Sequence, residues 1–327
     1  MRVLVTGGVG YIGSIVAEQL VARGDHVVVY DNLVTGHPRA VPPGAVFVRG
    51  DIGDASAVRA ALRDHGIDAV VHMAAVSLVG VSVQDPAAYY RNNVTAGLVM
   101  LDAMLAEGVK RIVFSSSASV YGEPERQPVR EDDATIPTSP YGETKLAFEK
   151  ILHWYDRAYG LRSVSLRYFN AAGASARAGE DHEPETHLIP RLLRVAVGTA
   201  PPIALFGDDY PTRDGTCVRD YVHVLDLADA HVVALDAVDG GSRVYNLGCG
   251  GAGYSVNEVV ETARRVTGHP LPVHVGPRRP GDPALLVASS DRIRAELGWA
   301  PRHQDLDAIV GSAWAWAKAH PRGWEDR

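Results

Sequence analysis

A glycine-rich segment near the start of the chain most strongly limits what this protein can fold into. The apolar stretch Arg2–Thr6 is followed by GGVGYIG and then by a helical pattern over Ile12–Arg23. The glycines form G-x-x-G-x-x-G. The first permits a tight turn, the second lets the backbone approach a pyrophosphate, and the third lets the helix pack on the strand. The helix N-terminus would offer free N–H groups to the phosphates. This order predicts a dinucleotide site on Gly7, Gly10 and Gly13.

The rest of the first half of the chain alternates apolar runs with helical patterns. Short runs rich in Val, Ile and Leu predict buried strands. Strands that are apolar along their whole length are typical of a parallel sheet covered on both faces. We therefore expect an α/β fold with a doubly wound parallel sheet (Rossmann fold), which binds ligands at the carboxyl ends of its strands. The expected strands are Arg2–Thr6, His26–Tyr30, Val46–Val48, Ala69–His72, Arg111–Phe114 and Ser163–Arg167, and the long helices are Pro86–Glu107 and Tyr141–Tyr159.

The alternation ends near Asn170. Residues 171–186 are small and polar, which predicts a loop. A helix near Leu188–Gly198, the segment ALFG and a loop at Gly207–Gly215 follow. We expect residues 1–170 to form the dinucleotide-binding domain. Residues 171–327 are expected to form a smaller mixed α/β lobe that binds the substrate, intertwines with the first domain and closes over the carboxyl edge of the sheet.

Composition excludes several classes of partner. A formal net charge of −7 disfavours nucleic acid, which usually requires a basic face. No apolar run reaches the ~20 residues that a membrane helix requires, and the chain starts with MRVLVTGG, without the pattern of a signal peptide. Cys217 and Cys249 cannot form a disulfide framework, so a reducing cytoplasm is expected. The 13 histidines include no H-x-x-x-H pair on an expected helix, so no metal site is expected.

Asp31 ends the second expected strand, 18 residues after Gly13. A carboxylate at this position can accept hydrogen bonds from ribose hydroxyls and repels a 2′-phosphate, which favours NAD over NADP. The alternative is an ordinary turn aspartate in Asp31-Asn32, but the spacing matches the dinucleotide pattern. Asp51 and Ile52 follow the third strand and are placed to reach the adenine; a loop cap is the alternative role for Asp51.

A second group of residues is suited to acid–base catalysis. Tyr141 and Lys145 lie in PYGETK, four residues apart, and therefore share one face of a helix. A cation beside a phenol favours the phenolate, so the tyrosine can act as a base nearer neutral pH. An exposed Tyr/Lys pair is the alternative, which the glycine loop and the serine-rich strand end FSSSASVYG disfavour. A serine hydroxyl there can bond to the oxygen that Tyr141 deprotonates. We select Ser117, although chemistry alone does not distinguish it from Ser115 and Ser116.

Longer motifs are spread nearly from end to end of the chain. With them, the chain resembles the UDP-glucose (UDP-galactose) 4-epimerase family of the extended short-chain dehydrogenase/reductase superfamily. The motifs that carry this resemblance are GGVGYIGS, DNLVTGH, GDIGD, YYRNNV, FSSSASVYGEP, SPYGETK, LRYFNAAGA, HLIP, FGDDYPTRDGTCVRDYVHVLDLADAH, YNLGCG and RRPGDPALLVASS.

The resemblance implies a complete site. Ser117, Tyr141 and Lys145 would be catalytic. The NAD site of the first domain would be lined by Gly7, Gly10, Tyr11, Ile12, Gly13, Asp31, Asn32, Asp51, Ile52, Met73, Ala74, Ala75, Ser77, Asn93, Ser115, Tyr141, Lys145 and Phe169. The UDP-sugar, held largely by the second lobe, would contact Ser117, Tyr141, Asn170, His187, Leu188, Ala204, Phe206, Arg219, Arg279, Asp282 and Leu286. Guanidinium groups at Arg219 and Arg279 suit a diphosphate, because their fork matches phosphate oxygens.

The reaction implied is an NAD-dependent inversion at C4 of a UDP-hexose through a transient 4-keto intermediate, with NAD regenerated. Tyr141 would take the proton of the 4-hydroxyl group and return it. Related dehydratases and decarboxylases carry extra acid and base groups where this chain has Ala118 and Ser119, so elimination is disfavoured. A non-catalytic NAD-binding protein is disfavoured because both Tyr141 and Lys145 are present.

The identity of the sugar stays open. Ser77 and His187 stand where one branch of the family has Lys and Asn. Leu286 stands at a gate position beside the 2-substituent of the sugar, and its size lies between the Tyr and the small residues found there. UDP-glucose/UDP-galactose is expected, and UDP-GlcNAc/UDP-GalNAc is the alternative. Arg191 lies on the helix after His187 and could reach a uronate, although a solvated helix arginine is the favoured interpretation. UDP-glucuronate/UDP-galacturonate is kept as a third option. The two long helices imply, by resemblance, a homodimer.

Overall fold

The centre of the molecule is a seven-stranded parallel sheet. The structure is a computed structural model that describes residues 1–279 and 282–325. The strand order is β11-β6-β5-β4-β1-β2-β3, so that the chain leaves β1 in one direction and returns to β4 on its other side. This reversal makes the switch point at which doubly wound folds bind ligands. The strands are β1 Arg2–Thr6, β2 His26–Asp31, β3 Val46–Arg49, β4 Ala69–His72, β5 Arg111–Ser117, β6 Arg162–Tyr168 and β11 Arg243–Leu247.

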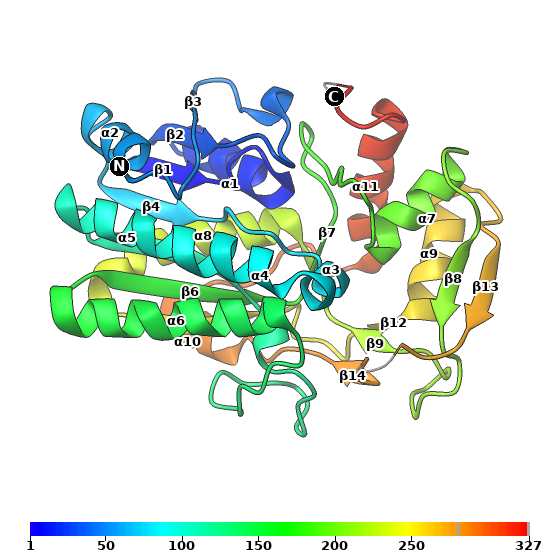
Figure 1. Cartoon of the computed structure of the whole chain (residues 1–327). Coiled ribbons are helices and arrows are strands. Elements are labelled where there is room, and N and C mark those ends of the chain that lie inside the picture. The colour runs from blue at the N-terminus through cyan, green and yellow to red at the C-terminus, as the bar shows by residue number, and fades with distance from the viewer. Residues whose placement is uncertain (280–281, 326–327) are drawn as a thin grey trace.

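Both faces of this sheet are buried. In β1, Val3 and Val5 face one hydrophobic core and Leu4 faces the other. The first core is closed by helices α1 (Tyr11–Ala22) and α8 (Val224–Ala237). The second is closed by α2 (Ala55–Asp64), α5 (Ala96–Ala106) and α6 (Pro140–Tyr159), as Figure 1 shows. Burial on both sides explains the continuously apolar strands and confirms the expected fold class.

The expected strands and helices are present, with one difference in a helix. The stretch expected as a single helix over Pro86–Glu107 divides into α4 (Pro86–Tyr89), a π-helical turn (Tyr90–Thr95) and α5. Within the turn, the amide of Asn93 bonds to the backbone of Val76 and to Oγ1 of Thr144. These tertiary bonds hold Asn93 inward, and π-turns of this kind are frequent at functional sites.

A smaller lobe packs beside the carboxyl edge of the sheet (Figure 1). Helices α7 (Leu188–Ala196), α9 (Val256–Thr267) and α11 (Leu306–Ala319) share a core of their own. Short strands complete the lobe and its junction with the sheet: β8 Ile203–Phe206 with β13 Val273–Gly276, β12 Tyr254–Ser255 with β9 Val218–Arg219 and β14 Leu285–Leu286, and β7 Asn170–Ala172 with β10 Tyr221–His223.

The two parts interleave along the chain. Strand β11 and helix α8 belong to the sheet region although they come from beyond residue 170, and α10 (Asp291–Leu297) packs against β11. The division at residue 170 therefore stays a prediction about function rather than a boundary in space. Among the described residues, no helix combines the length and the apolar character required to cross a membrane.

A buried ion pair joins α6 to β6 under the site described below. The guanidinium group of Arg167 donates to both carboxylate oxygens of Glu149, at 2.9 and 2.6 Å, and each side chain is 6% exposed. Ser116 donates a further hydrogen bond to Glu149, and Arg167 donates to the hydroxyl group of Tyr121. Every charged group here has its partners, which a buried pair requires.

We expect Glu149→Ala to lower the free energy of unfolding by about 3–5 kcal/mol, because it leaves the Arg167 charge buried without its partner. Urea denaturation followed by circular dichroism measures this change. The matched control is Lys150→Ala at the exposed neighbouring position, which should stay within about 0.5 kcal/mol of wild type. Equal effects of the two substitutions would contradict the assignment.

Candidate active site

The glycine-rich segment follows β1 as a tight loop beneath the start of α1. Gly7 has a φ of +68°, and a Cβ atom there would lie 2.6 Å from the backbone nitrogen of Ala74. A Cβ atom on Gly13 would overlap the carbonyl oxygen of Gly7. Gly10 precedes the helix in an extended conformation and provides no side-chain cap. The first N–H groups of α1 are therefore available to a ligand, and an anion is the ligand that they favour.

Asp31 lies beside this loop at the end of β2. Its carboxylate is 9% exposed and accepts hydrogen bonds from the backbone N–H groups of Leu33 (2.9 Å) and Val9 (3.4 Å). Burial raises the pKa of Asp31. Asn32 donates to Asp51 at 2.8 Å, and Ile52 is buried. The ends of β2 and β3 therefore place acidic and amide groups beside the glycine loop.

The segment after β4 forms the opposite wall of this candidate cofactor site. The backbone nitrogens of Met73 and Ala74 approach Oγ1 of Thr6 at 3.3 and 3.5 Å. Ala75 is half-buried, Ser77 is exposed, and Asn93 is 4% exposed. Phe169 packs on a small cluster that includes Val120. The structure thus brings the glycine loop, the segment after β4 and Asn93 to the same edge of the sheet.

Lys145 is the cation of the expected catalytic group, and it is deeply buried. It is 3% exposed, and Nζ donates to the carbonyl oxygen of Ser115 at 2.7 Å. Nζ lies 5.8 Å from the centre of the Tyr141 ring. Burial lowers the pKa of Lys145 to about 7, and the nearby carboxylate of Glu149 opposes this shift. Because Glu149 stands four residues after Lys145 on α6, the helical spacing could have marked it as a supporting residue.

Tyr141 stands in the first turn of α6, which Ser139 caps by accepting a hydrogen bond from the N–H group of Gly142. Burial raises the pKa of Tyr141 to about 12, and a hydrogen bond with Ser117 opposes this rise. Ser117 ends β5 and lies 3.2 Å from the hydroxyl oxygen of Ser119. The rings of Tyr89 and Tyr141 form a T-shaped pair, a contact that sequence reasoning missed. The structure therefore brings Ser117, Tyr141 and Lys145 together.

The residues expected to hold the second ligand form separate groups. Arg219 lies 3.2 Å from the carboxylate of Asp282 and also donates to the carbonyl oxygen of Pro283. The guanidinium group of Arg279 stacks over the ring of Phe206 at 4.0 Å, on the strand that also carries Ala204. Part of the motif RRPGDPALLVASS, residues 280–281, lies outside the described residues.

The remaining expected ligand contacts flank these groups. Leu286 packs with Phe169 on the cluster around Val120. Asn170 donates to the carbonyl oxygen of Asp220 at 2.9 Å. His187 precedes α7, whose first residue is Leu188, and its Nδ1 faces Glu180 and Glu185 rather than the catalytic group.

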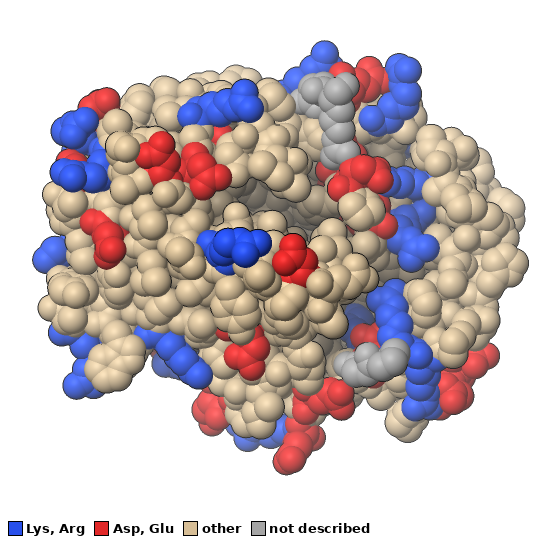
Figure 2. Space-filling model, viewed as in Figure 1, with Lys and Arg blue, Asp and Glu red and all other residues tan. Residues whose placement is uncertain are grey.

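Figure 2 shows the surface hollowed between the sheet region and the smaller lobe, with basic side chains along the side of the lobe. A cavity of about 700 Å³ lies nearby, between α7, α11 and the loop that contains Glu180. None of the residues expected to bind cofactor or substrate lines it, so the candidate active site is identified by its chemical groups and not by this cavity.

Comparisons with known proteins identify relatives over nearly the whole chain. Residues 3–248 match the model of the NAD dependent epimerase/dehydratase family. A UDP-glucose 4-epimerase of Halalkalibacterium halodurans is 53% identical over 328 residues, which cover 99% of this chain and 98% of that protein. A crystal structure of a UDP-glucose 4-epimerase superposes with a TM-score of 0.97 at 49% identity, covering 99% of this chain and 100% of the other. A second, from Brucella ovis in complex with NAD, superposes with a TM-score of 0.94 at 46% identity, covering 96% and 98%.

We expect Gly13→Ala to reduce bound dinucleotide to below about half of the wild-type content, because the added methyl group would push α1 away from the glycine loop at a cost of about 1–3 kcal/mol. Chromatography of the cofactor released from the denatured protein measures the content. Gly311→Ala is the matched control, since that helical glycine faces open space. Full cofactor content in the Gly13 variant would show that the close approach does not matter for binding.

Proposed function

The chain belongs to the NAD dependent epimerase/dehydratase family, and from this membership we propose how its site inverts C4 of a UDP-hexose. The observation that carries the proposal is the meeting of Ser117, Tyr141 and Lys145 at the strand edge that also holds the glycine loop. The full-length similarity to UDP-glucose 4-epimerases supports an isomerase that uses NAD.

The residues present fit NAD. The uncapped start of α1 suits its pyrophosphate, and the carboxylate of Asp31 suits the hydroxyl groups of its adenosine ribose. When bound, NAD would supply reversible hydride transfer at C4 of the sugar, so that no net cofactor would be consumed. The remaining expected contacts, from Asn32, Asp51, Ile52, the segment Met73–Ser77, Asn93 and Phe169, line the same edge and are part of this proposal.

Tyr141 holds and moves the proton. It takes the proton of the 4-hydroxyl group as hydride leaves C4, and it gives the proton back to the 4-keto sugar. Burial raises its pKa to about 12, which is too high for this task near neutral pH. A protonated Lys145 would favour the phenolate and thereby lower the pKa of the phenol, and the positive charge of a bound nicotinamide would act in the same direction. Ser117 bonds to the same phenol and positions the sugar oxygen.

The smaller lobe holds the UDP-sugar. Arg219 and Arg279 bind the diphosphate, Phe206 lies against the uracil, and Asp282 accepts from a ribose hydroxyl group. The guanidinium group of Arg219 donates a hydrogen bond to Asp282 and is therefore already oriented when the ligand enters. Asn170, His187, Leu188 and Ala204 complete the expected contacts. Ala118 and Ser119 provide no acid or base for elimination, and the Ser119 backbone N–H donates to Ser117 instead.

We propose UDP-glucose and UDP-galactose as the preferred pair. The names of the relatives support this choice. Leu286, which is expected beside the 2-substituent, is of intermediate size and does not distinguish the two pairs of sugars. We further propose a homodimer formed through α5 and α6, supported by the exposed rings of Trp154 (63%) and Tyr159 (52%) on α6.

We also propose the cytoplasm as the location of the protein, because its two free cysteines are buried and are typical of a reducing compartment.

The function is tested by incubating the purified protein, without added NAD, with UDP-galactose, UDP-GalNAc and UDP-galacturonate in turn and identifying the products. We expect the gluco epimer from UDP-galactose without net NADH.

Tyr141→Phe should lower kcat by about 10²–10⁴-fold, because it removes the acid/base group. Tyr90→Phe is the control, since that ring is 43% exposed on the neighbouring π-turn. A 4-keto-6-deoxy sugar or a pentose as product, or full activity of Tyr141→Phe, would overturn the assignment.

The pH profile tests the role of Lys145. Loss of the cation in Lys145→Met raises the pKa of Tyr141, so less phenolate is present at neutral pH. We expect kcat of the variant to rise about tenfold per pH unit between pH 7 and 9, since the phenolate fraction grows tenfold per unit below the pKa. Wild type should reach its plateau at lower pH. Lys150→Met, at an exposed position of the same helix, should follow wild type. Parallel profiles for wild type and Lys145→Met would contradict this role.

A further inference from the structure

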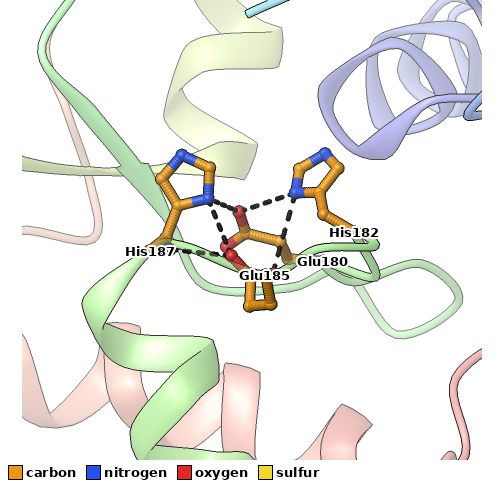
Figure 3. Close-up of side chains that lie close together, drawn as sticks. All are labelled: Glu180, His182, Glu185 and His187. Carbon is orange, nitrogen blue, oxygen red and sulfur yellow. Dashed lines mark hydrogen bonds and ion pairs between the residues drawn. The ribbon is translucent and has the colours of Figure 1, made fainter. Parts of the chain in front are cut away.

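Four side chains of the loop between β7 and α7 gather in one small space outside the catalytic group. Figure 3 shows Glu180, His182, Glu185 and His187 facing one another. Nδ1 of His182 lies 3.1 Å from Glu180 and 3.8 Å from Glu185. Nδ1 of His187 lies 2.7 Å from Glu180 and 3.0 Å from Glu185. One nitrogen or carboxylate oxygen from each residue lies within 4.8 Å of the others.

The two carboxylates of this cluster are deeply buried. The side chain of Glu180 is 8% exposed and that of Glu185 is 1% exposed. Oε2 of Glu185 is buried without a hydrogen-bond donor among the residues that the structure describes. A buried polar atom left without a partner costs about 1–3 kcal/mol. The cluster therefore holds two buried carboxylates that face the imidazoles of His182 and His187, and one acceptor atom without a hydrogen-bond donor among the described residues.

We propose that Glu180, His182, Glu185 and His187 bind one divalent transition-metal ion of the zinc type. Zinc takes four ligands in a tetrahedron with Zn–N and Zn–O distances of about 2.0–2.2 Å, which places neighbouring ligand atoms about 3.3 Å apart. The carboxylate-to-imidazole distances of 2.7–3.8 Å lie on either side of that value. Two imidazole ligands favour zinc over Mg²⁺ and Ca²⁺, which prefer sets of oxygen ligands.

Charge balance agrees with this proposal. Two carboxylates and one divalent cation sum to zero when both imidazoles are neutral, which is the state in which histidine binds metals. The ion also has a route in. The imidazoles of His182 and His187 are 30% and 49% exposed, and Glu180 lines the cavity of about 700 Å³ beside α7 and α11.

The position of the cluster indicates a structural role for the ion. His187 directly precedes α7, and the ring of His182 lies edge-on to that of Tyr11 in the first turn of α1. All four ligands come from eight consecutive residues, so the metal would hold the loop in one conformation between the cofactor helix and the smaller lobe. This inference shares His187 with the expected UDP-sugar contacts, whereas Glu180, His182 and Glu185 lie outside the proposed catalytic and binding residues.

The test uses full-length protein without a histidine tag, stripped with a chelator and titrated with ZnCl₂ by isothermal calorimetry. We expect about one zinc ion per chain, undiminished by millimolar Mg²⁺, and an anomalous diffraction peak at the zinc edge between the four side chains. Glu180→Gln and His182→Gln should each weaken zinc binding at least about 100-fold, since loss of even an outer-shell partner costs about 10–100-fold. Cys217 and Cys249 are buried and do not compete for the ion.

Glu183→Gln is the matched control, because this glutamate lies in the same loop with its side chain 64% exposed. It should bind zinc as wild type does. Circular dichroism and dinucleotide content verify that each variant is folded, and zinc should raise the Tm of wild type and of Glu183→Gln only. The proposal is overturned by wild-type protein that binds no zinc, by undiminished binding in Glu180→Gln and His182→Gln, or by an anomalous peak elsewhere.

Discussion

The hydrogen bond from Nζ of Lys145 to the carbonyl oxygen of Ser115, 2.7 Å long, ties α6 to the end of β5. One turn further along the helix, Glu149 binds both Ser116 and Arg167, so the same face of α6 is fixed to β5 and β6. These contacts leave little freedom in how the helix lies on the sheet. Tyr141 at the start of α6 is placed by this attachment, and its distance from Ser117 at the end of β5 follows from it.

The same attachment determines the electrostatics of the site. An ammonium group buried among apolar side chains tends to lose its proton, and burial indeed lowers the pKa of Lys145 to about 7. The Glu149 carboxylate counteracts that loss from one side, and a phenolate on Tyr141 would do so from the other. Glu149 is in turn held by Arg167. A structural ion pair thus acts on the proposed catalytic group through Lys145, although neither of its members contacts Tyr141 in the described interactions.

The sequence predicted those features of the molecule that are formed by residues close together in the chain. A strand, three spaced glycines and a helix identify the loop at Gly7–Gly13, and four-residue spacing pairs Tyr141 with Lys145. The division of Pro86–Glu107 could not be predicted, because it depends on bonds from Asn93 to Val76 and Thr144, which are distant in sequence. The pairing of Arg279 with Phe206 and of Arg219 with Asp282 likewise requires the folded lobe. The assignment of cofactor binding to residues 1–170 and of substrate binding to residues 171–327 remains a prediction. Strand β11 and helix α8 belong to the sheet region although they follow residue 170, so the two parts of the chain do not separate in space at that residue.

The cluster at Glu180–His187 escaped sequence reasoning for a related reason. Metal ligands on a helix recur at fixed spacing, so they can be sought as H-x-x-x-H, whereas a loop brings ligands together by its own path. That path is fixed here by contacts at both ends: Tyr11 donates to the carbonyl oxygen of Gly173 at 2.6 Å, and Arg194 of α7 donates to the carbonyl oxygen of His182 at 2.7 Å. The first contact begins in α1, the helix proposed to face the dinucleotide, and the second begins in α7, in the smaller lobe proposed to hold the substrate. A change in the loop conformation would therefore act on both α1 and α7, and an ion held between the four side chains would fix the loop between these two helices.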